Sequence, residues 1–480
     1  MPKIAFFTAF NCGIPEVESF QKEILPDILA EFDVDLFTTD LSIPLPPELE
    51  DRANVYSYRD FVPISSFKEY DLLLYQLAGC PEFELVYDSC LQFPGLILLE
   101  SFNLSEMLVR KWLSLKEKEK FRGEMEKCSG LKGKLVADDI LAGRFDSYRT
   151  NLIKYPLLER VINLSLGIIV RNRFVFNFIR RKREDIPLFL IPHRVNVLER
   201  SQRSQEEPDT LVGDPSRIAE VLKGEKDFVV FVHGHTQEPG SAGSMIGAFE
   251  RLLDFFPQSA LIIQPSELSK VEKAFEKNKH KENIFMLPGM DPFTIPGLVN
   301  RLDLIVDINL PYCGEVSLLT LKLMAQGKPT LFFDRGAYRE IPQHCAIKIN
   351  PELDFRSRIN YFLQLFAHNR RLAKAVGQAG ARYVEQQFSG QGGSDAYLSL
   401  LRDYFSSRQM WKEVGQESRE VIGEKVREQA RAGPKRDAIQ VDPELSDFAI
   451  SLYRELKFLG FAGDDSLAED ILEAAAEVAL

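Results

Sequence analysis

Residues 304–333 read LIVDINLPYCGEVSLLTLKLMAQGKPTLFF, and this stretch decides the fold. It begins with one apolar run, Leu304 to Ile308, and ends with another, Thr330 to Phe333. Between them a helical pattern extends from about Glu315 to Ala325, and a glycine and a proline follow as a stop signal. A strand, a helix and a second strand in this order predict two parallel strands joined by a crossover helix.

The same alternation extends over the second half of the chain. Continuous apolar runs predict further strands at Phe228–Val232, Ala260–Gln264 and Ile284–Leu287, and a helix is expected over Met245–Phe256. Helices between Arg356 and Gln387 close this half. Apolar runs that do not alternate with polar residues are typical of parallel strands covered by helices on both faces.

The first half has the same organisation, and a helix that Pro26 should bend follows its first strand. The predicted strands are Ile4–Phe7, Val34–Thr38, Leu72–Gln76, Leu96–Leu99, Leu166–Val170 and Leu188–Ile191. The polar composition of residues 196–224 indicates a linker. We therefore expect two Rossmann-like, doubly wound α/β domains, at 1–195 and 225–400, that face each other across a cleft. A helical extension is expected at 401–480.

Composition excludes several classes of protein. The chain has 480 residues and a formal net charge of -12, which argues against a nucleic-acid binder because such proteins usually present a basic face. The six cysteines show no CxxC spacing, so neither a disulfide framework nor a zinc site is predicted. The longest apolar region, Val161–Ile179, is interrupted by arginines and is not expected to span a membrane, and the apolar run at the N-terminus is too short for us to expect a secretory signal. We expect a cytoplasmic protein.

Several segments resemble the family-four glycosyltransferases, which have the GT-B fold. The matching segments are the opening strand with its acceptor-side loop at Gly13 and Ile14, Pro94–Leu99, Ser165–Val170, Asn309–Ser317, Met324–Thr330 and Glu340–Pro342. The resemblance extends over residues 1 to 400. It implies transfer of a sugar from a UDP- or GDP-linked donor, with retention of configuration and with no metal or other cofactor.

The donor site that the resemblance implies is the loop Gly314–Ser317. A loop that ends at a helix N-terminus presents unpaired backbone amides, which suit a nucleotide diphosphate. Gly314 allows close approach of the backbone, Val316 continues the loop, and Ser317 is expected to cap the helix or contact an oxygen. Glu315 is the predicted catalytic carboxylate and should accept hydrogen bonds from sugar hydroxyls. The alternative is an ordinary capped helix in which Glu315 is favoured only by the helix dipole.

Three features of the family pattern are altered, and in one of them Gly240 replaces a lysine. Glu100 stands where the first domain normally has a histidine, and we expect it either to contact a sugar as a catalytic residue or to cap the next helix. His235 replaces the arginine of the phosphate grip, and His235 and Thr236 are the predicted phosphate contacts. On the donor helix Lys322 replaces a glutamate, and it either contacts phosphate or is solvated.

These departures leave two functions open. The first is a glycosyltransferase that uses a nucleotide-sugar, which requires Glu100, His235 and Glu315 to face one another across the cleft. The second is a catalytically inactive relative that binds or assembles with a protein partner through the C-terminal helices. The basic run Arg180–Arg183 either contacts an anionic membrane or is an ordinary cationic helix end.

Overall fold

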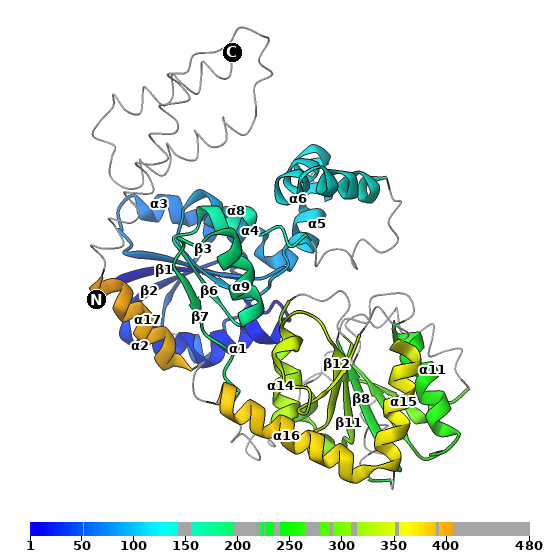
Figure 1. Ribbon diagram of the computed structural model, residues 1–480. Helices are drawn as coiled ribbons and strands as arrows, with labels where there is room; N and C mark the ends of the chain where they lie inside the picture. The colour runs from blue at the N-terminus through cyan, green and yellow to red at the C-terminus, as the bar shows by residue number, and fades with distance from the viewer. Residues whose placement is uncertain are drawn as a thin grey trace.

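The computed structural model of the chain has two α/β domains, each built on one parallel sheet (Figure 1). The residues that the structure describes are 1–50, 52–114, 116–142, 155–195, 218, 221, 223–224, 226–234, 241–264, 279–287, 291–308, 314–350, 355–389 and 393–407.

The first sheet has the strand order β3-β2-β1-β4-β5-β6-β7, and each pairing is parallel; Ile4, for example, lies beside Val34 on one side and Leu72 on the other. Its strands are β1 Lys3–Thr8, β2 Asp33–Thr38, β3 Asn54–Ser57, β4 Leu72–Leu77, β5 Leu96–Leu99, β6 Gly167–Val170 and β7 Leu188–Leu190. The helices of this part are α1 Pro15–Glu23, α2 Leu25–Glu31, α3 Phe61–Ser65, α4 Glu84–Gln92, α5 Ser105–Ser114, α6 Lys118–Leu141, α8 Glu159–Leu164 and α9 Arg173–Lys182.

The second sheet has the strand order β10-β9-β8-β11-β12-β13 and is again parallel, with Val306 between Val232 and Leu331. Its strands are β8 Val229–His233, β9 Ala260–Ile263, β10 Ile284–Met286, β11 Leu304–Asp307, β12 Thr330–Phe333 and β13 Ile347–Ile349. The helices are α11 Ser241–Leu253, α13 Leu298–Arg301, α14 Leu318–Ala325, α15 Phe355–His368, α16 Arg370–Phe388 and α17 Ser394–Ser406, and a short 3-10 helix, η6, spans Gly336–Glu340.

The predicted doubly wound architecture is confirmed. Each predicted strand is present and differs from its expected bounds by at most one residue at either end. The structure adds two short edge strands, β3 and β13, that the sequence did not predict. The helix expected from Glu315 begins at Leu318, and the helix expected to bend at Pro26 is divided at Ile24 into α1 and α2.

The chain passes between the two domains more than once. Beside the end of the first domain, the Val195 N–H donates to the carbonyl oxygen of Phe388, at the end of α16. Helix α17 then returns and packs beside α2 of the first domain, where the rings of Phe405 and Phe32 are 5.4 Å apart (Figure 1). The boundary expected at residue 400 therefore falls inside α17. Residues 408–480, most of the expected helical extension, lie outside the described residues.

Candidate functional site

The predicted donor loop lies directly against the first domain. Gly314 has φ +100°, a left-handed conformation that glycine adopts at little cost. A Cβ atom at this position would overlap the side chain of Phe102, which follows β5. The Asn172 side-chain amide donates to the Gly314 carbonyl oxygen at 3.4 Å. Glycine at 314 thus lets the loop pass closely by the first domain.

The backbone amides at the start of α14 are held by side chains. The Leu318 N–H donates to Oε1 of Glu16 at 2.8 Å, and the Ser317 N–H donates to the Tyr338 hydroxyl at 3.2 Å. Glu16 comes from α1, which begins at Pro15 directly after the predicted Gly13–Ile14 loop and lies beside α14 (Figure 1). A carboxylate is the kind of group that the positive end of a helix favours.

The Glu315 carboxylate also crosses to the first domain. The Phe102 backbone N–H donates to Oε1 of Glu315. Burial raises the pKa of Glu315 well above its usual range; the bond from Phe102 opposes this shift, and the negative charges of Glu16 and Glu100 add to it. In this arrangement, Glu315 faces the first domain at the point where the two domains meet.

The second predicted catalytic carboxylate, Glu100, forms a buried ion pair. Arg171 at the end of β6 donates from Nε to Oε2 at 2.8 Å and from Nη2 to Oε1 at 2.6 Å. The Gln76 amide donates to Oε1 at 2.9 Å, so both carboxylate oxygens are engaged. The expected cap role goes to another residue, because the Asn103 side chain accepts the Ser105 N–H at the start of α5, at 2.9 Å.

A buried hydrogen-bond network, which sequence reasoning missed, supports the donor loop. Thr320 on α14 donates to Oδ2 of Asp307 at 2.5 Å and lies 3.1 Å from Nε2 of His233. The Tyr338 hydroxyl, which accepts from Ser317, donates to the same Asp307 oxygen. Burial lowers the pKa of His233, so its ring is neutral at neutral pH. The available signal was the presence of polar residues at the carboxyl ends of two buried strands.

The remaining predicted site residues are placed as follows. His235 and Thr236 lie outside the described residues, so the expected meeting of Glu100, His235 and Glu315 is not tested. Val316 packs at the edge of the apolar cluster under α14. Lys322 is in the last turn of α14, at the opposite end from the donor loop. The basic run at the end of α9 contacts protein groups, since Arg183, directly after the helix, donates to the carbonyl of Ile162 at 3.0 Å.

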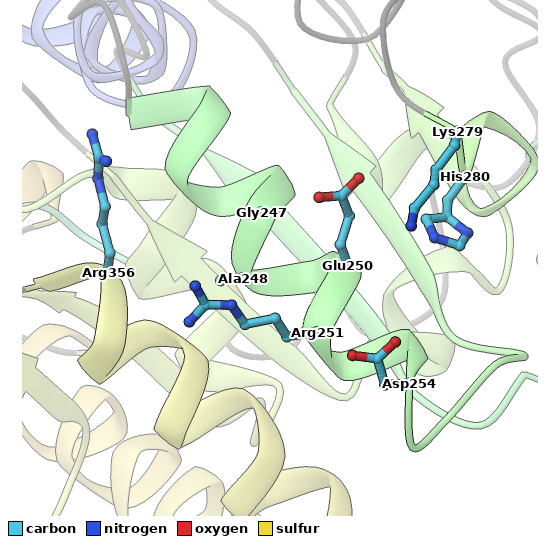
Figure 2. Close-up of a pocket in the computed structure, with 8 residues that line it drawn as sticks. All are labelled: Gly247, Ala248, Glu250, Arg251, Asp254, Lys279, His280 and Arg356. Carbon is cyan, nitrogen blue, oxygen red and sulfur yellow. The ribbon is translucent and has the colours of Figure 1, made fainter.

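A separate hollow of about 400 Å³ lies on the second domain beside α11 and α15 (Figure 2), which are on the other side of the sheet from α14 (Figure 1). Arg251 on α11 and Asp254 just after the end of that helix line it, together with Lys279, His280 and Arg356 on α15. Its lining includes two acidic side chains, Glu250 and Asp254, as well as basic ones, so its charge is mixed. It contains none of the residues that the sequence singled out.

Comparisons with solved structures identify the architecture. Sucrose-phosphate synthase from Thermosynechococcus elongatus superposes with a TM-score of 0.58 at 13% identity, over 85% of this chain and 100% of that one. HepE from Anabaena, in complex with UDP-glucose, superposes with a TM-score of 0.56 at 12% identity, over 84% of this chain and 100% of that one. WaaG, a glycosyltransferase involved in lipopolysaccharide biosynthesis, superposes with a TM-score of 0.53 at 12% identity, over 83% of this chain and 99% of that one. The chain therefore has the GT-B fold of glycosyltransferases.

The sequence comparisons give no closer assignment. No protein-family model matches the chain, and no curated protein matches it in sequence. Within the described ranges, no three His, Cys, Asp or Glu side chains are grouped so that they could hold a metal ion. The same ranges contain no helix with the length and apolar character needed to cross a membrane.

Proposed function

We propose that the protein is a cytoplasmic glycosyltransferase that transfers a sugar from a UDP- or GDP-linked donor to an acceptor, with retention of configuration. The observation that carries the proposal is the loop Gly314–Ser317, which ends at the N-terminus of α14 and lies against the first domain. Structural neighbours with UDP and UDP-glucose bound support a nucleotide-sugar as the donor.

The residues divide into roles that the chemistry requires. Sugar transfer from a nucleotide-sugar needs stabilisation of the departing diphosphate, which the backbone amides at the start of α14 are suited to give. The Glu315 carboxylate would accept hydrogen bonds from the sugar hydroxyls. His235 and Thr236 are proposed as further phosphate contacts, and the Gly13–Ile14 loop as the acceptor-side wall. Glu100 serves as a positioning residue, since its two oxygens are bonded to Arg171 and Gln76.

A second candidate is a binding protein that has lost catalysis. Two observations favour it. Glu100 forms an ion pair with Arg171, and Glu16 already accepts the Leu318 N–H at the start of α14. The two functions differ in one measurable property. A transferase without an acceptor releases nucleotide slowly as water takes the acceptor's place, whereas a binding protein leaves the nucleotide-sugar intact.

The test is calorimetric titration of the full chain with UDP, GDP and their common sugar conjugates, followed by measurement of free nucleotide over time. We expect saturable binding; Glu315→Ala should weaken binding of the sugar conjugates at least tenfold, and His235→Ala should weaken binding of every one of these ligands at least tenfold. Glu385→Ala, at an exposed position on α16, is the matched control and should bind as the wild type does. A folded protein that binds none of these ligands at millimolar concentration contradicts the proposal.

A further inference from the structure

The two domains exchange carboxylate-to-amide hydrogen bonds in both directions. Glu16 of the first domain accepts the Leu318 N–H of the second at 2.8 Å. In the opposite direction, Glu315 of the second domain accepts the Phe102 N–H of the first. These residues are separated by more than 200 positions in the chain, so the bonds depend on how the two domains meet.

A third carboxylate makes the same kind of contact. Glu340 at the end of η6 accepts the Phe174 N–H at 2.6 Å and the Arg173 N–H at 3.3 Å. Both amides belong to the first turn of α9 in the first domain. Glu16 and Glu340 therefore each hold the N-terminus of a helix in the other domain, where backbone amides lack partners within the helix and the dipole favours negative charge.

The position of these bonds matters because two of them use the groups proposed for the donor. The amide that Glu16 holds opens α14, where the diphosphate would lie, and the carboxylate that Phe102 holds is the one proposed for the sugar. A single amide hydrogen cannot serve Glu16 and a phosphate oxygen equally well at the same time. A donor must replace Glu16 before it can use this end of the helix.

We propose that Glu16, Glu315 and Glu340 form an interdomain clasp, in which each carboxylate accepts a backbone N–H of the other domain and the groups of the donor site bond to each other. The nucleotide-sugar then competes directly with the Glu16 carboxylate. This inference rests on the proposed function for the identity of the competing ligand. The clasp itself rests only on the contacts between the two domains.

The first experiment tests the clasp without any ligand. Hydrogen exchange of the full chain is followed at the start of α14 and at Phe102, in the wild type and in Glu16→Ala. We expect the Leu318 amide to exchange several-fold faster in Glu16→Ala. Glu18→Gln is the matched control. Glu18 lies on the same helix and pairs with Lys22 at 3.7 Å, and the substitution removes one negative charge, as Glu16→Ala does. Unchanged exchange in Glu16→Ala would overturn the clasp.

The second experiment tests the competition with UDP as the probe. Glu16→Ala should bind UDP roughly tenfold more tightly than the wild type, whereas Glu16→Gln, which keeps an acceptor oxygen for the Leu318 amide, should bind UDP about as the wild type does. Glu18→Gln should match the wild type. If the wild type and Glu16→Ala bind UDP equally, the competition is wrong while the proposed donor class stands. If no variant binds UDP or GDP, the proposed function fails and the competition fails with it, but the exchange result still decides the clasp.

Discussion

At the scale of single residues, the structure explains Glu100 by a partner that lies far away in the sequence. The Glu100 side chain is fully buried, and that of Arg171 is 4% exposed, so each charge depends on the other for compensation. Arg171 also donates to the hydroxyl of Tyr397 on α17, which joins the pair to the returning C-terminal helix. A carboxylate held in this way maintains the shape of the first domain next to the donor loop.

We predict that Arg171→Leu lowers the free energy of unfolding by about 3–5 kcal/mol, because it leaves the Glu100 carboxylate buried without a counter-charge. Urea denaturation followed by circular dichroism measures the change. Arg110→Leu is the control, since Arg110 forms an exposed pair with Glu106 at 3.0 Å and should cost no more than about 1 kcal/mol. If the two substitutions lowered the free energy of unfolding equally, the buried Glu100 carboxylate would not depend on Arg171 as its counter-charge.

Gly314 gives a second prediction at this scale. Gly314→Ala introduces a Cβ at φ +100°, a strained conformation that typically costs about 1–3 kcal/mol, and the new atom would overlap Phe102. We expect a lower melting temperature and faster exchange of the Phe102 amide, because the loop must move away from the first domain. Gly123→Ala in α6 is the control; its Cβ has open space, and it should raise stability by up to about 1 kcal/mol. A Gly314→Ala protein with wild-type exchange would contradict this account.

At the scale of secondary-structure elements, the sequence predicts the strands that form continuous apolar runs and misses the edge strands that do not. The central strands are buried on both faces and therefore appear as unbroken apolar runs. The edge strands β3, with sequence NVYS, and β13, with sequence IKI, are short and partly exposed, so no such run marks them. Helix α14 begins at Leu318 and not at the expected Glu315, because the positive φ of Gly314 and the non-helical ψ of Ser317, 130°, keep residues 314–317 outside the helix.

The candidate site was predictable to a similar extent. Gly314 and Glu315 could be found because they stand in one short loop before a helix. Glu16 could not, since it contacts α14 from the start of the chain. Asp307 and Tyr338 are closer in sequence, and Asp307 lies near the end of a predicted strand, but the sequence does not show that they bond to Thr320 and Ser317. Their roles depend on the packing of α1, β11 and η6 against α14, which local sequence patterns do not report.

The element-scale prediction concerns the support of the donor loop. Tyr338→Phe removes the hydroxyl that accepts from Ser317 and donates to Asp307, leaving the buried Asp307 carboxylate with one donor fewer. We expect a loss of about 1–3 kcal/mol in unfolding free energy, together with faster exchange at the start of α14. Tyr361→Phe is the control because Tyr361 is 59% exposed, and it should change neither measurement. An effect confined to global stability, with no local change in exchange, would show that Tyr338 does not position the loop.

At the scale of the whole molecule, the clasp should respond to pH. Burial is the largest cause that raises the pKa of Glu16, Glu315 and Glu340 in the closed arrangement. The charges of Glu100 and Asp307 add to the shift at Glu16, and those of Glu16 and Glu100 add to it at Glu315. At Glu340, the bonds from the Phe174 and Arg173 amides and the charge of Arg173 oppose it, and Tyr383 also faces this carboxyl.

The sign of the pH effect follows from these raised values. A carboxyl group that binds its proton more tightly in the closed arrangement than in the open one favours closure in acid. That contribution is complete below the ordinary carboxyl pKa and is lost as the pH rises through the raised one. We therefore predict that small-angle X-ray scattering of the full chain gives a smaller radius of gyration at about pH 5 than at about pH 8. Glu315→Gln removes the group whose pKa is raised well above its usual range, so this variant should show a weaker pH response, whereas Glu18→Gln should keep the full response. A radius of gyration that is constant across this interval, or that shrinks as the pH rises, would mean that the three carboxyl groups do not control closure. The domains would then have to be held together mainly by apolar contacts such as that of Phe405 with Phe32.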